Sequence, residues 1–429
     1  MLKTIKSGTE VSVQDVITTQ VEETVKTMLA DIRKGGVAAV RKYSEKLDRY
    51  NPEQFRLSQG EIDDAVASLT PEERSAIEFS LEQIKGFAEA QRATMKDLEV
   101  ETLPGVVLGH RHIPIDAVGC YAPGGRYPMV ISPFMSIVTA KAAGVRRVVA
   151  CTPPRSGKPH PATVATMALA GADEIFVLGG VQALAAMAYG TETLEPVDFL
   201  VGPGNVYVAE AKRQLFGTVG IDLIAGPTEI LVVADDSADA EMVATDLLGQ
   251  AEHGPTSVSV LLTSSERLAN GLEAEIKRQL EKLDTADVAG KAWRDCGQIL
   301  LVDSREELVT EADRIASEHV EILTEDPTYF LEHMTNYGSL FLGPETNVAY
   351  GDKTIGTNHI LPTNRAARYT GGLWAGKFLK TVTYQRCTPE ASVQIGENCM
   401  TICDIEGFSA HREQAALRVR RYRAPVGTE

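Results

Sequence analysis

The sequence predicts an α/β fold of two doubly wound, Rossmann-like lobes, with an N-terminal helical segment and a C-terminal tail. Three observations lead to this prediction. From Ile113 onward, short β-branched runs alternate with Ala-rich helical stretches, which is typical of parallel βαβ units covered by helices. The 429 residues suffice for more than one domain. The predicted strands would make one unusually large open sheet, so two lobes fit better.

The first hundred residues predict helices. Apolar residues recur at helical spacing over 13–33, and Gly35-Gly36 then gives a C-cap signal. Thr70-Pro71-Glu72-Glu73 is a capping box with proline at the first helical position, so a long helix should run to about Lys96.

The alternating part of the chain predicts strands separated by helices. Each strand is a short apolar, β-branched run bounded by turn residues. The predicted strands are Ala117–Tyr121, Arg147–Cys151, Glu174–Leu178, Phe199–Val201, Glu229–Ala234, Ser257–Thr263, Gln298–Val302 and Ser339–Leu342.

The pattern changes again after about Thr370. The last part of the chain combines cysteines, polar residues and a basic helix over His411–Arg423. We interpret it as an appendage that docks on a partner subunit. The alternative is a helix packed on its own domain.

The chain is acidic, with 42 basic and 59 acidic residues and a formal net charge of −17. A field of this sign disfavours nucleic acid and anionic membranes as partners. An anionic ligand would therefore need cationic side chains beside its site. With 44% hydrophobic and 24% charged residues, the composition is that of a globular protein and excludes intrinsic disorder.

The six cysteines are scattered, and none has CxxC spacing. Cys399 and Cys403 are four residues apart, a weak metal signal, so we interpret the cysteines as reduced thiols. The N-terminus lacks the apolar segment of a secretion signal, and no apolar run is long enough to span a membrane. These features predict a cytoplasmic protein.

Two motifs place a histidine beside an oxygen donor near a predicted helix end. Gln250 and His253 are spaced i, i+3 after the apolar stretch 240–248, so their side chains face one way and can form half of a zinc site. Glu318 and His319 follow a helical run, and an adjacent acid and imidazole suit proton transfer near neutral pH. A histidine that only stabilises a helix C-terminus is the alternative for each motif.

Two later segments are rich in glycine and polar side chains. Residues 351–363 carry Asp352 and His359, and loops hold functional groups more often than scaffolds do. A turn-rich connector would explain the glycines there but not the density of metal-capable groups. Glu406 and His411 flank a predicted turn before the last helix.

One segment is a candidate for nucleotide binding. Gly202-Pro203-Gly204-Asn205 follows a predicted strand and opens a helix, so its amides can face a phosphate or ribose. The third glycine of a dinucleotide fingerprint is missing, because position 207 is Tyr207. Nucleotide binding and a simple turn both stay open at this point.

Together these motifs resemble one family closely, histidinol dehydrogenase and its paralogues. The resemblance covers nearly the whole chain in the family's order. Each stretch alone is modestly specific, whereas the set is highly specific. The matching stretches are GCYAPGG (119–125), GGVQALAAMAYG (179–190), VGPGNVYVAEAKRQL (201–215), AGPTEILVVAD (225–235), DLLGQAEHG (246–254), SEHVEILTEDP (317–327), GDKTIGTNHILPT (351–363) and EGFSAH (406–411).

The resemblance implies a zinc enzyme that uses NAD. It implies oxidation of a primary alcohol to a carboxylate through an aldehyde, in two hydride transfers, with one zinc ion per active site. His319 is placed to take the alcohol proton, and Glu318 is the candidate base for activating water. By position, the zinc ligands are Gln250, His253, Asp352 and His411; the catalytic pair is Glu318 and His319; the substrate contacts are Thr228, Asp352, His359 and Glu406; and the NAD contacts are Tyr121, Gln182 and Asn205.

The resemblance also implies a homodimer with shared active sites, because in the family the C-terminal region crosses to the other subunit. The implied domains are an N-terminal helical segment (1–25), a zinc-binding and catalytic lobe (26–105 with 230–370), an NAD lobe (106–229) and a dimerisation tail (371–429).

Several residues depart from the usual histidinol dehydrogenase pattern. Lys353 follows Asp352 where an aromatic is usual, and Thr228 stands where a serine is usual. The segments 124–130 and 367–385 also differ. These features look like the sulfopropanediol 3-dehydrogenase branch, which oxidises 2,3-dihydroxypropane-1-sulfonate to sulfolactate. Candidate cations for binding the sulfonate are Arg126, Lys353, Arg365 and Lys377.

Three alternatives remain. Within the family, the substrate could be L-histidinol, oxidised to L-histidine. A non-catalytic binding protein on the same scaffold would have no need to keep the metal and catalytic residues. A zinc hydrolase that makes no use of NAD would leave Gly202-Pro203-Gly204-Asn205 without a role.

Overall fold

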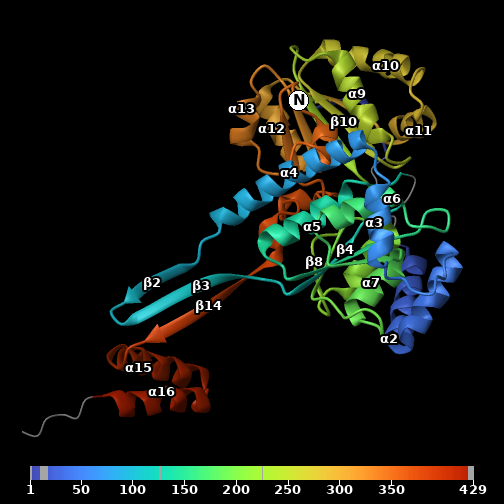
Figure 1. Ribbon diagram of the computed structural model, residues 1–429. Helices are drawn as coiled ribbons and strands as arrows, with labels where there is room; N and C mark the ends of the chain where they lie inside the picture. Colours follow the sequence, from blue (N-terminus) through green and yellow to red (C-terminus); the bar gives the residue numbers. More distant parts are fainter. Residues whose placement is uncertain (1, 10–17, 125–126, 225, 424–429) are drawn as a thin grey trace, which may run out of the picture. The chain divides into compact units, whose positions relative to one another are not determined.

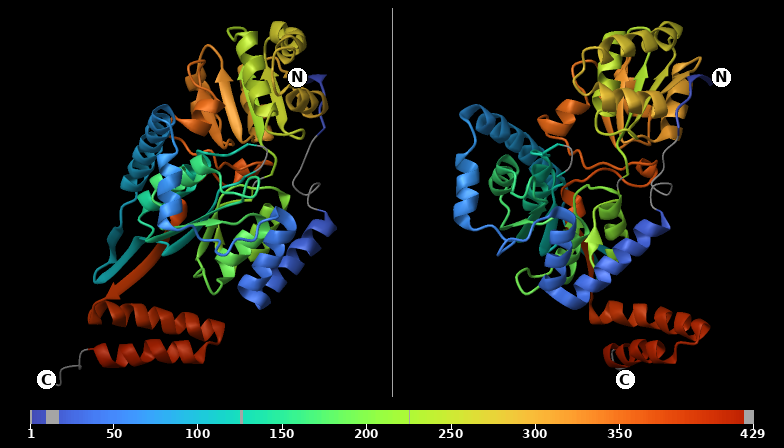
Figure 2. Two further views of the ribbon diagram at one scale, coloured as in Figure 1. Left: turned by 45° about the vertical axis from the view of Figure 1, so that its right-hand side comes forward. Right: turned by 90° about the vertical axis from the view of Figure 1, so that its right-hand side faces the viewer.

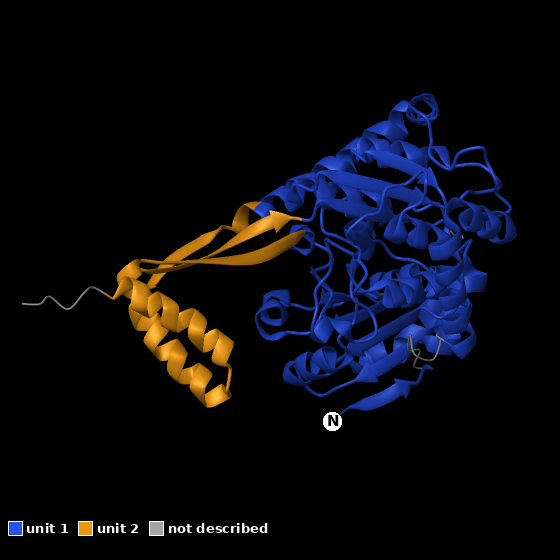
Figure 3. Ribbon diagram, turned by 90° about the horizontal axis from the view of Figure 1, so that it is seen from below, with its two compact units in different colours: residues 1–92, 115–378 blue, residues 93–114, 379–429 orange. Residues whose placement is uncertain are grey.

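The computed structural model describes residues 2–9, 18–124, 127–224 and 226–423. Contacts within the chain divide it into two compact units (Figure 3). Unit 1 carries two sheets built mainly of parallel strands, which confirms the predicted α/β class with two doubly wound lobes. In the described part of the chain, no helix is long and apolar enough to cross a membrane. Unit 1 consists of Met1–Arg92 and Ile115–Phe378, and unit 2 of Ala93–Pro114 and Leu379–Glu429.

The first lobe of unit 1 is built on a six-stranded sheet. Its strands, in spatial order, are β1 (Lys3–Lys6), β11 (Gln298–Leu301), β10 (Val258–Thr263), β9 (Glu229–Ala234), β12 (His319–Leu323) and β13 (Ser339–Leu342). One face packs on α9 (Ala240–Ala251), α10 (Glu266–Leu280) and α11 (Ala286–Cys296). The other packs on α12 (Arg305–Ile315) and α13 (Pro327–His333) (Figure 1). Because successive residues of β9, such as Ile230 and Leu231, enter opposite cores, the strand is apolar throughout.

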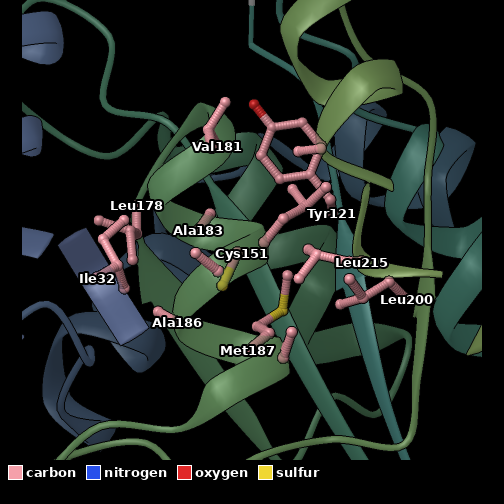
Figure 4. Packing of buried hydrophobic residues seen from close by; sticks show 14 of the residues in the cluster. Ile32, Tyr121, Cys151, Leu178, Val181, Ala183, Ala186, Met187, Leu200 and Leu215 are labelled. Carbon is pink, nitrogen blue, oxygen red and sulfur yellow. The ribbon is translucent and has the colours of Figure 1, made fainter. Parts of the chain in front are cut away.

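The second lobe of unit 1 has a five-stranded parallel sheet. Its strands, in spatial order, are β6 (Glu174–Val177), β5 (Arg147–Thr152), β4 (Ala117–Tyr121), β7 (Phe199–Val201) and β8 (Gly220–Ile221). One core contains side chains of α2 (Thr19–Asp48), α7 (Gly180–Tyr189) and α8 (Val206–Leu215). In Figure 4, Ile32 of α2 lies in the same cluster as Cys151 of β5 and Met187 of α7. The remaining helices of this lobe are α3 (Gln59–Ala67), α5 (Ser132–Ala143) and α6 (Pro161–Leu169).

Unit 2 combines a small sheet with two helices. The antiparallel strands β14 (Leu379–Cys387), β3 (Val106–Pro114) and β2 (Leu98–Leu103) lie in that order. The helices α15 (Pro389–Glu406) and α16 (Ser409–Tyr422) pack on each other. Between them Gly407 adopts a left-handed conformation with φ of 75°, as predicted for a turn before the last helix. The elements of unit 1 not yet named are α4 (Pro71–Thr94, whose last two residues belong to unit 2), α14 (Val348–Lys353), η1 (Ala366–Arg368) and η2 (Ala375–Phe378).

The predicted strands and the capping box are confirmed. Each of the eight predicted strands corresponds to an observed one within a residue at either end. At the start of α4, the N–H of Glu73 donates to Thr70 Oγ1 at 3.2 Å, and the N–H of Thr70 donates to the Glu73 carboxylate at 2.9 Å. These reciprocal bonds satisfy two backbone donors that the helix cannot satisfy itself.

The N-terminal segment differs from the prediction. It begins with the edge strand β1, visible in blue beside the sheet in Figure 2. The predicted end of the first helix at Gly35-Gly36 is wrong, because α2 continues through a kink to Asp48. Gly36 takes a φ of 52° there, so this glycine bends the chain instead of ending the helix. Residues 10–17, part of the predicted helix, lie outside the described residues.

The domain boundaries also differ from those implied. Residues 26–105 were grouped with 230–370, but Val25 and Ile32 of α2 share a core with the five-stranded sheet of the other lobe. Residues 93–114 join the C-terminal region in unit 2, because β3 pairs with β14 along its whole length. The physical cause is long-range pairing between strands that are far apart in the sequence.

Candidate active site

The predicted site residues of unit 1 lie at the carboxyl edge of one sheet and at the amino edge of the other. Tyr121 ends β4 and Gly202 follows β7, so both lie at the carboxyl edge of the five-stranded sheet, the usual place for ligands in such folds. Thr228 precedes β9 and His319 begins β12, so both lie at the amino edge of the six-stranded sheet.

Glu318 and His319 lie at the start of a buried strand, not at a helix end as predicted. Helix α12 ends at Ile315, and Ala316 takes a left-handed conformation with φ of 53° that turns the chain toward β12. His319 pairs in register with Ile230 and therefore points to the face covered by α9. The imidazole of His319 therefore faces α9, the helix that carries Gln250.

Glu318 is buried and held by donors from the neighbouring strand. The Thr228 hydroxyl donates to Glu318 Oε2 at 2.6 Å, and the N–H of Glu229 donates to the same oxygen at 3.0 Å. The side-chain amide of Gln250 donates in turn to Thr228 Oγ1. Burial raises the pKa of Glu318, against the opposing influence of His319 and these hydrogen bonds. A carboxylate with a raised pKa is a better general base than a free one.

The backbone fixes the tautomer of His319. Its Nδ1 lies 3.0 Å from the carbonyl oxygen of Glu229, which can only accept, so we assign the proton to Nδ1. Nε2 is buried without a hydrogen-bond partner among the described residues. It lies 3.8 Å from Asp352 Oδ1. The Nε2 lone pair is therefore free to accept a proton.

Most of the predicted metal and substrate residues of unit 1 line a pocket of about 470 Å³. Asp352 lies on the short helix α14 and not in a loop, and His253 lies just beyond the end of α9. His359 Nδ1 lies 3.0 Å from the carbonyl oxygen of Asp352, which leaves Nε2 as a buried atom without a described partner. The lining includes Gln250, His253, Asp352, Lys353 and His359.

These residues fit a zinc ion by their chemistry. Burial lowers the pKa of His253, so its imidazole is neutral near pH 7, as a ligand must be. The His253 imidazole, the Asp352 carboxylate and the Gln250 amide line this pocket and are nitrogen and oxygen donors of the kind that zinc accepts. Within the described ranges, however, no three His, Cys, Asp or Glu side chains gather closely enough to hold a metal ion.

Two predicted residues lie in unit 2. Glu406 ends α15 and His411 lies in the first turn of α16, on either side of the turn at Gly407. Both side chains are exposed. The pocket in unit 1 therefore contains three of the four predicted zinc ligands, and the fourth, His411, belongs to the other unit.

Asn205 lies beside a second pocket of about 380 Å³. It caps α8, accepting from the N–H groups of Tyr207 and Val208. The lining also includes Thr228 and His253, so this pocket adjoins the first one. Two hydrogen bonds fix the turn before Asn205: the N–H of Gly202 donates to Asp222, and the carbonyl of Gly202 accepts from Lys212. Lys212 and Asp222 also form a buried ion pair, which the sequence analysis did not predict.

The other two predicted NAD contacts form a cluster of their own. The N–H of Gly180 donates to the Tyr121 hydroxyl at 3.1 Å. Gln182 Nε2 donates to Asp48 Oδ2 at 2.7 Å, and its side-chain oxygen is buried without a described partner. Neither Tyr121 nor Gln182 lines the pocket beside Asn205.

Among the candidate cations, Lys353 lines the first pocket. Its Nζ lies 3.8 Å from Asp352 Oδ2, and about half of the side chain is exposed. Lys377 donates instead to the Thr370 hydroxyl at 3.0 Å, and Arg365 is exposed at the start of η1. Arg126 lies outside the described residues.

Sequence reasoning missed three acids near the site, of which Glu321 is buried and Glu229 and Asp246 are half-buried. Glu229 accepts from the N–H of Asn364 at 2.9 Å, and burial raises its pKa to about 8. Asp246 and Glu321 line the first pocket. Spacing could have indicated the last two, because Asp246 is one helical turn from Gln250 and Glu321 is two strand residues from His319.

Comparisons with known proteins agree on one family. The family model described as histidinol dehydrogenase matches residues 12–419. A histidinol dehydrogenase homolog of Shouchella clausii is 64% identical over 94% of this chain and 95% of its own length. The sulfopropanediol 3-dehydrogenase of Ruegeria pomeroyi is 45% identical over 94% of this chain and 93% of its own length. The crystal structure of histidinol dehydrogenase from Elizabethkingia anophelis superposes with a TM-score of 0.91 at 33% identity, covering 98% of this chain and 95% of that one.

Proposed function

Because this chain belongs to the histidinol dehydrogenase family, we propose that it oxidises a primary alcohol to a carboxylate through an aldehyde, with NAD as hydride acceptor and zinc in the active site. The observation that carries the proposal is the buried, unpartnered Nε2 of His319 beside Asp352. His319 does not line the pocket itself, but its Nε2 lies beside Asp352, which does. A base with a fixed tautomer next to such a group is what alcohol oxidation requires.

The roles of this chain's residues follow from their contacts. Gln250, His253 and Asp352 would hold the zinc ion in unit 1. His319 Nε2 accepts the proton of the alcohol. Glu318, with its raised pKa, then takes a proton from the water that attacks the aldehyde. When bound, zinc would polarise the substrate oxygen and NAD would accept hydride.

We further propose that NAD lies along the carboxyl edge of the five-stranded sheet. Asn205 opens a helix whose N-terminal amides suit a phosphate or ribose. The pocket beside Asn205 reaches Thr228 and His253, which places it next to the proposed site of hydride loss. Tyr121 and Gln182 are proposed contacts at a more distant part of the cofactor.

For the substrate we propose 2,3-dihydroxypropane-1-sulfonate, oxidised to sulfolactate. Lys353 lines the pocket and can bind a sulfonate by a charge-assisted hydrogen bond. The 45% identical relative named sulfopropanediol 3-dehydrogenase supports this choice. L-Histidinol is the competing substrate, favoured by the 33% identical histidinol dehydrogenase structure.

We also propose a homodimer with shared sites, in which His411 and Glu406 of one subunit complete the pocket of the other. Their helices and the turn between them expose large apolar side chains, among them Ile402, Ile405 and Phe408, which suits burial against another chain. A cytoplasmic location fits the six cysteines, which all lie in the described part of the chain and are free thiols.

The test is a spectrophotometric NADH assay with both substrates. Zinc-loaded protein should form NADH rapidly with the sulfonate and slowly or not at all with L-histidinol. Robust turnover of L-histidinol without turnover of the sulfonate would contradict the proposed substrate. If no NADH forms with either substrate or with a panel of primary alcohols, the proposed alcohol oxidation is wrong.

A further inference from the structure

Two carboxyl groups, Asp246 and Glu321, lie on the same elements of unit 1 as the proposed residues Gln250 and His319. Glu321 is two residues after His319 on β12, so both side chains point to the face covered by α9. Asp246 is four residues before Gln250 on α9, one turn away on the same side of the helix. Asp246 and Glu321 line the same pocket as Gln250 and Asp352.

Glu321 holds the beginning of α14. The N–H of Val348, the first residue of α14, donates to Glu321 Oε1 at 2.9 Å. This bond satisfies a backbone donor for which the helix has no partner of its own. Asp352 lies one turn further along α14. The position of Asp352 is therefore linked through this bond to the strand that carries His319.

The two carboxyl groups also contact each other. Glu321 is 1% exposed, and its Oε2 accepts no hydrogen bond from an N–H or hydroxyl group of the described residues. Burial raises the pKa of both groups, and the charge of Asp246 raises that of Glu321 further. A pair of this kind retains one proton near neutral pH, and that proton forms the hydrogen bond between them.

We propose that Asp246 and Glu321 are positioning residues whose contact joins the three elements carrying Gln250, His319 and Asp352. The pair fixes α9 to β12, and β12 to α14, in the wall of the pocket. It acts through those three residues and does not itself touch substrate or metal. This role rests on the proposed function, since that function assigns zinc binding to Gln250 and Asp352.

Three variants test the proposal. Glu321→Gln keeps an oxygen for the Val348 N–H and an amide donor for Asp246, so it should preserve the contact. Glu321→Met removes both interactions at similar size. Asp246→Ala leaves the Val348 bond intact and removes only the link to α9, and it carries the test if Glu321→Met does not fold. Glu210→Met is the matched control, because Glu210 is a buried acid bonded to Arg213 and Gln214 on α8.

Two measurements separate the proposal from the proposed function. The first is hydrogen exchange of the α14 amides in zinc-free protein, which needs neither metal nor catalysis. Exchange should accelerate in Glu321→Met and stay near wild type in Glu321→Gln and Glu210→Met. The second is the zinc dissociation constant, measured by competition with a chromogenic chelator. It should rise by roughly 10- to 100-fold in Glu321→Met, the usual effect of losing a residue that orients a metal ligand, and remain within about threefold in Glu321→Gln.

The outcomes are distinct. If Glu321→Met exchanges normally at α14, or exchanges faster with unchanged zinc affinity, the positioning role is wrong. If Glu321→Gln changes α14 exchange and zinc affinity as much as Glu321→Met does, the hydrogen bonds of Glu321 do not position Asp352, and the role is also wrong. If wild-type protein neither binds zinc nor oxidises an alcohol, the proposed function fails, while the exchange result still decides whether the pair holds α14.

Discussion

The imidazole Nδ1 of His319 lies 3.0 Å from the backbone oxygen of Glu229, and this contact decides which ring nitrogen can act as a base. The carbonyl accepts a hydrogen bond from the Nδ1–H, so the lone pair is on Nε2, which lies 3.8 Å from Asp352 Oδ1. Since the acceptor is backbone on a central strand, side-chain motion cannot easily alter the tautomer. The backbone of strand β9 therefore determines the tautomer of His319 on strand β12.

Replacement of His319 by Asn should lower turnover by about 10²- to 10⁴-fold, because a general base is lost. The zinc content should stay as in the wild type, since His319 is not a proposed ligand. Steady-state kinetics and metal analysis of the same preparation check this. His333→Asn, which changes a histidine stacked on Tyr329, is the control and should have normal activity. Near-normal turnover of His319→Asn would remove His319 from the mechanism.

Shared active sites predict complementation between two inactive variants. His319→Asn and His411→Ala homodimers should each be nearly inactive, and the second should also lose zinc. After unfolding and refolding together, mixed dimers should contain one intact site, restoring up to about a quarter of wild-type activity by random pairing. Refolding each variant alone is the control. No recovery in the mixture, with dimers present, would show that His411 acts within its own subunit.

Replacement of Thr228 by Val should shift the pH dependence of aldehyde oxidation to higher pH. The Thr228 hydroxyl bond lowers the pKa of Glu318, so its loss raises that pKa further above its usual range. Glu318 must be ionised to act as a base, and the rising limb of the rate profile therefore moves upward. Thr228→Ser keeps the hydroxyl and should keep the profile. An unshifted profile in Thr228→Val would contradict the role of Glu318.

Replacement of Lys353 by Met should lower kcat/KM for the sulfonate by roughly 10- to 100-fold, the scale of a lost hydrogen bond to a charged group. The effect should be mainly on KM. Propane-1,2-diol, which lacks the sulfonate, should be oxidised as by the wild type. Lys377→Met is the control, because Lys377 does not line the pocket and bonds to Thr370. Equal losses for both substrates would mean that Lys353 does not recognise the anion.

Much of the fold could be predicted because the buried strands are continuous apolar runs. Val118 and Val148 lie in such runs, with helices covering both sides of the sheet, and these strands were predicted almost residue for residue. Strand β12 escaped prediction because Glu318, His319 and Glu321 interrupt its apolar pattern. These buried polar side chains break the continuous apolar run by which the other buried strands were predicted.

The site was less predictable than the strands. The resemblance to a family indicated which residues belong to the site. It did not indicate their contacts, because these join distant parts of the chain. Thr228 reaches Glu318 across 90 residues, and no local pattern records that bond. The same holds for the clamp of Lys212 and Asp222 on Gly202, which needs the sheet order to bring the partners together.

The most direct test of the central claim is the yield of NADH per substrate molecule. Zinc-loaded protein is given a limiting amount of 2,3-dihydroxypropane-1-sulfonate with excess NAD, and NADH and the organic product are quantified at completion. Two NADH per molecule, with sulfolactate as the product, are expected if one site carries out both oxidation steps. One NADH per molecule with accumulated aldehyde would contradict the account.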